Sequence, residues 1–180
     1  MYRIALAFAA LVALVVAGIA QSAAGAEQSS VSADQYGGKD RFVGSGKVAF
    51  TDFPSPGETT VEKFIVIARS GPEGEDAHGH ILFQSPFLEE EKVAKVNVTC
   101  LDVDGNVATA GGEFSPPIRY LGLSIRHLNV TVRDNGSDDT ATGLAFIDRE
   151  RPPGFSPCDV TAPPDFDVVQ GNYVVTDGTP

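Results

Sequence analysis

The chain has 180 residues, of which 24 are acidic and 13 are lysine or arginine, for a formal net charge of −11 at neutral pH. Such acidity argues against nucleic acids and anionic lipid headgroups as partners, because both would repel it. Solubility is the simplest reason for the charge, and the length suits one domain with its own hydrophobic core.

The first 26 residues have the pattern of an export signal. Arg3 is positively charged, residues 4–19 are all apolar or small, and Ala24-Gly25-Ala26 is a small-residue cleavage site. A membrane-spanning helix needs about 20 apolar residues and this run is shorter, so a membrane anchor is the weaker interpretation. We therefore predict a signal peptide over 1–26 with cleavage after Ala26, secretion into the extracellular space, and a mature protein that no membrane retains.

The rest of the chain reads as a short leader followed by β-strands. Residues 27–42 are largely polar and lack apolar periodicity, which predicts a flexible leader. Short β-like runs then alternate with turn clusters rich in glycine, proline, asparagine and aspartate. The expected strands are 43–50, 61–69, 79–84, 93–103, 106–114, 126–134, 142–149 and 168–176. They predict a single all-β domain over 43–176, an antiparallel barrel or sandwich of about eight strands, with a C-terminal tail over 177–180.

Four local patterns refine this expectation. In 126–134, apolar and polar residues alternate, which predicts a strand with one face in the core. Residues 64–68 are apolar on both faces, so we expect a central strand that is also covered on its outer side. Asp104-Gly105 predicts an antiparallel hairpin, and Gly171-Asn172 in the last strand indicates a bulge or the close approach of another backbone.

The two cysteines, Cys100 and Cys158, allow one intramolecular pairing. In an exported and therefore oxidising setting we expect them to form a disulfide. Cys158 lies in the proline-rich segment 151–164, so the bond would tie a connection with few other anchors to a strand. Two buried free thiols are the alternative, and a catalytic cysteine is less well supported because no histidine stands beside either one.

A histidine pair is the most suggestive candidate for chemistry. His78 and His80 are two residues apart on an expected strand, so both side chains lie on one face, where they could bind zinc together with His127 from another strand. Ile81 and Phe83 mark the core face, which places these histidines on the opposite one. Two exposed histidines at a strand start are therefore the simpler interpretation.

An acidic turn offers a second candidate. Asp134, Asn135, Asp138 and Asp139 carry the carboxylate and carbonyl oxygens that Ca²⁺ prefers. A solvated turn in an acidic protein explains the same residues more simply. No cofactor is expected beyond these possible zinc and calcium ions.

Three acceptor patterns for N-glycosylation begin at Asn97, Asn129 and Asn135. They matter only if the chain passes through a eukaryotic secretory pathway. Ordinary strand and turn composition explains them equally well.

Short motifs, mostly built on turn glycines, follow one another in a familiar order. They are Gly44-Ser45-Gly46, Ala68-Arg69 before Gly71-Pro72-Glu73-Gly74, Gly79-His80, Val98-Thr99-Cys100-Leu101, Gly105-Asn106-Val107-Ala108, Gly112, Val132-Arg133-Asp134-Asn135-Gly136 and Gly171-Asn172-Tyr173-Val174-Val175. This order resembles the post-COAP domains, small exported bacterial β domains found alone or appended to larger extracellular proteins. The likeness covers 43–176. It implies an exported β domain and assigns no activity, ligand or catalytic residue.

No catalytic constellation emerges from these residues, and we expect a secreted non-catalytic β module that binds an unidentified extracellular partner or surface, or serves structurally. Two alternatives remain open. The domain could be a β-barrel that holds a small apolar ligand in its interior, or a metal-dependent enzyme that uses the His78/His80 pair. An internal cavity would favour the former, and three converging histidines the latter.

Overall fold

The computed structural model describes residues 38–89, 92–149 and 152–178. The signal peptide predicted over 1–26 and residues 27–37 of the predicted leader lie outside these ranges. None of the helices in the described ranges has the length and apolar character that a membrane span requires.

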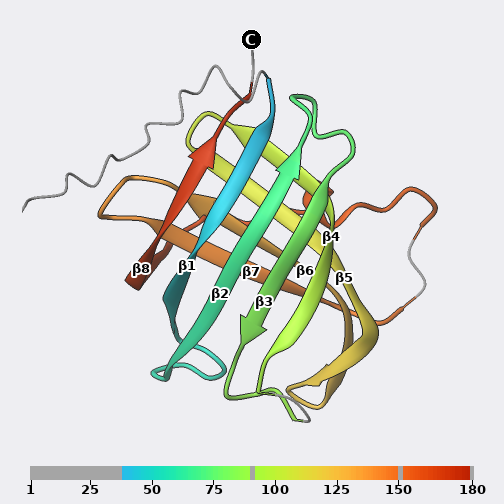
Figure 1. The fold of residues 1–180 in the computed structure, drawn as a ribbon. Helices are drawn as coiled ribbons and strands as arrows, with labels where there is room; N and C mark the ends of the chain where they lie inside the picture. Colours follow the sequence, from blue (N-terminus) through green and yellow to red (C-terminus); the bar gives the residue numbers. More distant parts are fainter. Residues whose placement is uncertain (1–37, 90–91, 150–151, 179–180) are drawn as a thin grey trace, which may run out of the picture. The chain divides into compact units, whose positions relative to one another are not determined.

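Eight antiparallel strands follow one another around a closed barrel, each paired with the next along the chain and the last with the first (Figure 1). The elements are β1 (Asp40–Thr51), β2 (Thr59–Ser70), β3 (His78–Gln84), β4 (Ala94–Asp104), β5 (Val107–Tyr120), β6 (Leu123–Arg133), β7 (Thr140–Ile147), the short 3₁₀ helix η2 (Pro157–Asp159) and β8 (Phe166–Thr176). The all-β prediction is confirmed, and of the two expected architectures the barrel is the one that forms.

Several strand boundaries differ from the sequence-based expectation, and two of these differences affect the core and the strand register. β1 begins at Asp40, so residues 40–42 belong to the barrel and not to the leader, because the Phe42 side chain is fully buried in the core. β5 continues to Tyr120, beyond the predicted end at residue 114. Its register with β6 shifts between Glu113 and Ile118, and this irregularity accommodates two prolines that cannot donate ladder hydrogen bonds.

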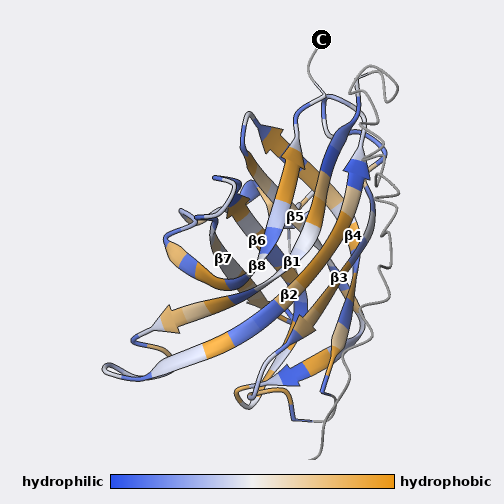
Figure 2. Cartoon of the chain, turned by 60° about the vertical axis from the view of Figure 1, so that its left-hand side comes forward, coloured by the Kyte–Doolittle hydropathy of each residue, from blue (hydrophilic) through white to orange (hydrophobic). Residues whose placement is uncertain are grey.

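Side chains fill the interior of the barrel. Hydrophobic and hydrophilic residues alternate along several strands, which is the pattern of a sheet with one buried face (Figure 2). The largest fully buried side chains of this core come from every strand but β7, and they are Phe42, Val48, Phe64, Val66, Ile81, Val96, Phe114, Val130, Val132 and Tyr173. The predicted alternation in 126–134 is confirmed, since Val130 and Val132 belong to this core.

Tyr173 joins the last strand to the first two. Its ring lies against Gly44 and Gly46 of β1, where an added Cβ atom would come within 2.8 Å and 2.6 Å of the ring. Its hydroxyl donates a hydrogen bond to the Phe64 carbonyl on β2 at 3.1 Å. The two glycines of Gly44-Ser45-Gly46 therefore make room for a tyrosine that closes the barrel.

The join between β7 and β8 depends on carboxylates more than on strand pairing. The two strands pair only at Thr140 and Ala141. Next to this short ladder, Asp139 accepts hydrogen bonds from the backbone N–H groups of Asn135 at 2.9 Å and Tyr173 at 2.8 Å. Asp134 likewise accepts from Val175 N–H at 3.0 Å. The two side chains thus satisfy backbone donors of β8 that β7 does not reach.

Residues 152–165, which we call the strap, follow β7 in the chain and precede β8. Their short helix η2 lies on the outer face of the barrel, against β4, β5 and β6. The predicted disulfide is confirmed: Cys158 of the strap is bonded to Cys100 of β4. Asn129 of β6 donates from its side chain to the carbonyls of Pro157 at 2.7 Å and Val160 at 2.6 Å. The strap is therefore attached covalently to one strand and by hydrogen bonds to another.

We predict that Asp139→Asn destabilises the barrel by about 1–3 kcal/mol, because an amide leaves one of the two backbone donors, the part-buried Asn135 N–H or the buried Tyr173 N–H, without an acceptor. Asp138→Asn is the matched control, since Asp138 is exposed in the same turn. Thermal unfolding should show a lower midpoint for Asp139→Asn alone. Equal midpoints for the two variants would contradict the role given to Asp139.

The disulfide should stabilise the fold mainly by restricting the unfolded chain. Its cysteines are 58 residues apart, for which the chain-entropy model gives about 4 kcal/mol. Cys100→Ser combined with Cys158→Ser should lower the free energy of unfolding by up to this amount, measured by denaturant titration. Unchanged stability would mean that the strap's hydrogen bonds hold it without the covalent bond.

Candidate functional site

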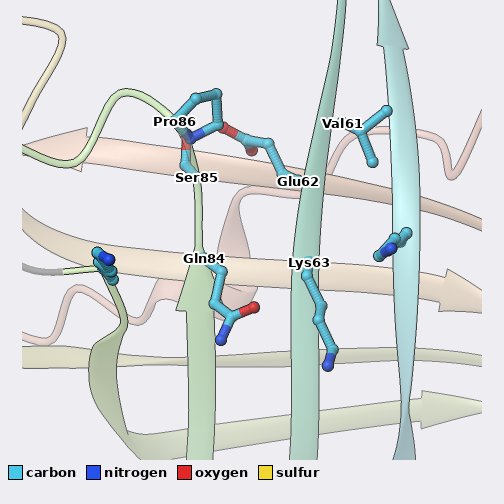
Figure 3. Close-up of a pocket in the computed structure, with 8 residues that line it drawn as sticks. Val61, Glu62, Lys63, Gln84, Ser85 and Pro86 are labelled. Atoms are coloured by element: carbon cyan, nitrogen blue, oxygen red, sulfur yellow. The ribbon is translucent and has the colours of Figure 1, made fainter.

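A shallow depression of about 210 Å³ lies on the outer wall of the barrel, where β3 ends and the chain turns away from β2. Figure 3 shows Lys63 and Gln84 next to each other on neighbouring strands, with Ser85 and Pro86 following and Glu62 directed toward them. The residues that line this depression are Lys47, Val61, Glu62, Lys63, Gln84, Ser85, Pro86 and Lys92. We call it the lysine depression.

Two of its lysines face each other across a strand pair. Lys47 of β1 lies directly opposite Lys63 of β2. Like charges in this position repel and destabilise a sheet. Neither lysine forms an ion pair with any residue that the structure describes. The two lysines therefore bring positive charge to the depression that no ion pair within the described residues neutralises.

The same two strands carry a second pair of like charges. Arg41 of β1 lies opposite Arg69 of β2, and the Arg41 Nε atom is buried without a hydrogen-bond partner. Lys47 lies six positions beyond Arg41 along β1, so the two cationic pairs are about 20 Å apart. The outward-facing positions of β1, β2 and β3 include no aspartate or glutamate.

An aliphatic band lies between these two pairs. Its members project outward from β1, β2 and β3, and they are Val43, Ile65, Ile67 and Leu82. The expectation that residues 64–68 are covered on their outer side is not met among the described residues, because the Ile67 side chain is 43% exposed. We call the two cationic pairs and this band together the cationic wall.

Behind the lysine depression lies a buried acid. Glu62 faces the interior of the barrel and is only 5% exposed, and the Tyr120 hydroxyl donates a hydrogen bond to its Oε1 at 2.8 Å. Phe83 and Phe87 pack against the Tyr120 ring, with centroids 5.6 and 6.2 Å away. Burial raises the pKa of Glu62, although hydrogen bonds from Ser85 and Tyr120 oppose the rise. Burial and the neighbouring Glu62 charge raise the pKa of Tyr120 as well.

The strand register does not bring the three histidines together. His80 pairs with Asn97 on β4, Asn97 with Glu113 on β5, and Glu113 with His127 on β6. Three strand spacings separate His80 from His127, or about 14 Å. Within the described ranges, no group of three or more histidine, cysteine, aspartate or glutamate side chains is placed to hold a metal ion. His78 and His80 do lie on the outer face, opposite Ile81 and Phe83, as expected.

The acidic turn considered for calcium is already engaged in holding the barrel together. The four carboxylate oxygens of Asp134 and Asp139 accept hydrogen bonds from the backbone N–H groups of residues 135, 136, 173 and 175. Asn135 and Asp138 are exposed beside them, and the Asp138 carbonyl accepts from the Asn135 side chain. The turn is thus a structural hydrogen-bond network.

The three glycosylation patterns differ in accessibility. Asn97 and Asn135 are exposed, whereas Asn129 is fully buried and uses its side-chain amide to hold the strap. In the folded protein the Asn129 pattern is therefore closed to modification.

Comparisons with protein family models, with curated proteins and with solved structures found no match.

Because burial raises the pKa of Glu62 above its unfolded value near 4.5, its protonation favours the folded state. This contribution is complete below pH 4.5 and is lost as the pH rises through the folded pKa. The isosteric change Glu62→Gln removes it. The variant should therefore gain thermal stability relative to the wild type as the pH rises from 4.5 toward 8.

Glu58→Gln, at an exposed position before β2, is the control for this titration. It should follow the wild-type profile throughout. If the difference between Glu62→Gln and the wild type were constant over the whole pH range, the titration of Glu62 would not contribute to stability.

Proposed function

We propose that the protein is a secreted, non-catalytic β-barrel module that binds an anionic partner outside the cell through the cationic wall. The observation that carries this proposal is the segregation of charge. A chain with 24 acidic and 13 basic residues places Arg41, Lys47, Lys63 and Arg69 on one wall whose outward positions on three strands hold no acid.

The two like-charge pairs support a binding role because they cost stability. Lys47 lies opposite Lys63, and Arg41 opposite Arg69. An anionic group bound at each pair would add attractions that offset the repulsion within it. General solubility does not require such an arrangement, since the remaining acidic surface already supplies a large net charge.

The outer wall is favoured over the interior as the binding surface. Phe42, Phe64 and Tyr173 fill the barrel, which leaves little support for an apolar ligand inside it. Two surface depressions of about 210 and 140 Å³ are smaller than the roughly 300–1,000 Å³ of typical small-molecule sites. The separation of His80 from His127 likewise gives no support to a metal-dependent enzyme. The export pattern of residues 1–26 and the resemblance to post-COAP domains support an extracellular role.

Binding of the mature chain, residues 27–180, to poly-L-glutamate tests this function. We expect binding at about 10 mM salt, where the Debye length is about 30 Å, despite the negative charge of the protein, and progressive loss as salt is added. Lys47→Glu combined with Lys63→Glu should weaken binding at least about 10-fold, which corresponds to about 1.4 kcal/mol.

Arg133→Glu combined with Arg149→Glu is the matched control, because it changes the net charge equally at exposed sites away from β1–β3. It should bind much more tightly than the lysine double variant. No binding by the wild type, or equal loss in both double variants, would overturn the proposed function. Circular dichroism should confirm that all variants remain β-sheet proteins.

A further inference from the structure

Resting on the proposed function, we infer that the partner is an acidic protein surface that also presents aliphatic side chains, and that it covers the aliphatic band between the two cationic pairs. The apolar residues of the cationic wall indicate the chemistry of the partner, which positive charge alone leaves open.

The aliphatic band is placed where a partner's contact would be centred. Ile65 and Ile67 of β2 and Val43 of β1 lie between Arg41–Arg69 at one end and Lys47–Lys63 at the other. The side chain of Val174, on the neighbouring strand β8 opposite Val43, extends the band and is 46% exposed. A contiguous apolar patch with a charged rim is typical of a protein-binding surface.

The pattern of residues 64–68 points the same way. A strand that is apolar on both faces is expected to be covered on both sides. Phe64 and Val66 are buried in the barrel, whereas Ile67 remains open on the outer side. The described part of the chain therefore covers one face of this strand and leaves the other for a partner.

Other anionic partners fit the wall less well. No phenylalanine, tyrosine or tryptophan occupies an outward position on β1, β2 or β3. Sugar-binding surfaces and membrane-interface surfaces both rely on such rings. An anionic bilayer would also act as an extended negative surface against a chain of net charge −11. A local acidic patch with aliphatic side chains matches both components of the wall.

The area of the cationic wall limits the expected binding affinity. It spans about 20 Å along the strands and about 15–20 Å across β8, β1, β2 and β3, or roughly 300–400 Å². A standard protein interface buries about 800 Å² on each partner. The contact should therefore be weak and transient, with affinity that depends on salt.

The test compares two synthetic helical peptides of equal negative charge. One carries glutamates beside a leucine face, and the other has serine in place of every leucine. At about 150 mM salt, where the Debye length is about 8 Å, the wild type should bind the leucine peptide at least about 10-fold more tightly than the serine peptide.

Ile67→Ser should abolish this preference, so that the variant binds the leucine peptide and the serine peptide equally. Leu123→Ser is the matched control, because Leu123 is similarly exposed, at 47%, but lies at the start of β6 outside the wall. It should keep the preference for the leucine peptide.

The outcomes separate the two proposals. If poly-L-glutamate binds at low salt but the leucine peptide has no advantage, or if Ile67→Ser keeps that advantage, the inference fails and the proposed function stands. If neither poly-L-glutamate nor either peptide binds, the proposed function fails with it. Tighter binding to polygalacturonate, or to vesicles of phosphatidylglycerol and phosphatidylcholine, would assign the wall to another class of partner and overturn the inference.

Discussion

The carboxylate of Asp139 is the contact on which the closure of this barrel depends. It joins the turn before β7 to the Tyr173 backbone of β8, across a join where the two strands pair at only two positions. Without that join, β7 and β8 would be the two open edges of a sheet, and the core would be accessible to water along one side. Tyr173, held by the same carboxylate, also packs against β1 and donates to β2. One acidic side chain thereby helps to hold β8 where Tyr173 reaches β1 and β2.

Local patterns in the sequence predicted the strands well, because strand formation depends on the alternation of neighbouring residues. The runs around Val96–Val98 and Leu128–Val132 both form strands with a buried apolar face. The choice between barrel and sandwich could not be predicted, since it depends on whether β8 meets β1, which lie more than 100 residues apart. The roles of Asp134 and Asp139 were hidden for the same reason, because their partners on β8 are distant in the sequence.

The candidate site was less accessible to sequence reasoning than the fold. Lys47 and Lys63 are unremarkable as separate residues, and only the register of β1 and β2 places them opposite each other. Glu62 and Tyr120 are also far apart in the sequence. Glu62 lies between two outward-facing residues, so strand alternation places it on the core side, but its carboxylate is not a side chain that the pattern would assign to a core. One signal was present: residues 64–68 are apolar on both faces of the strand, which indicated that other residues pack against the outer side of β2. That expectation fails within the described chain, and it is the basis for assigning the surface to a partner.

The burial of Asn129 has a practical consequence for producing the protein. Its side-chain amide donates to two strap carbonyls, and the residue begins an Asn-Val-Thr pattern that glycosylating enzymes recognise in unfolded chains. A sugar attached there during synthesis in a eukaryotic host would occupy the space beneath the strap and remove one of those bonds. Cys158 would then be held away from Cys100, and the disulfide would not close. Bacterial expression with export to an oxidising compartment avoids this block, and replacing Thr131 would serve the same purpose in eukaryotic cells.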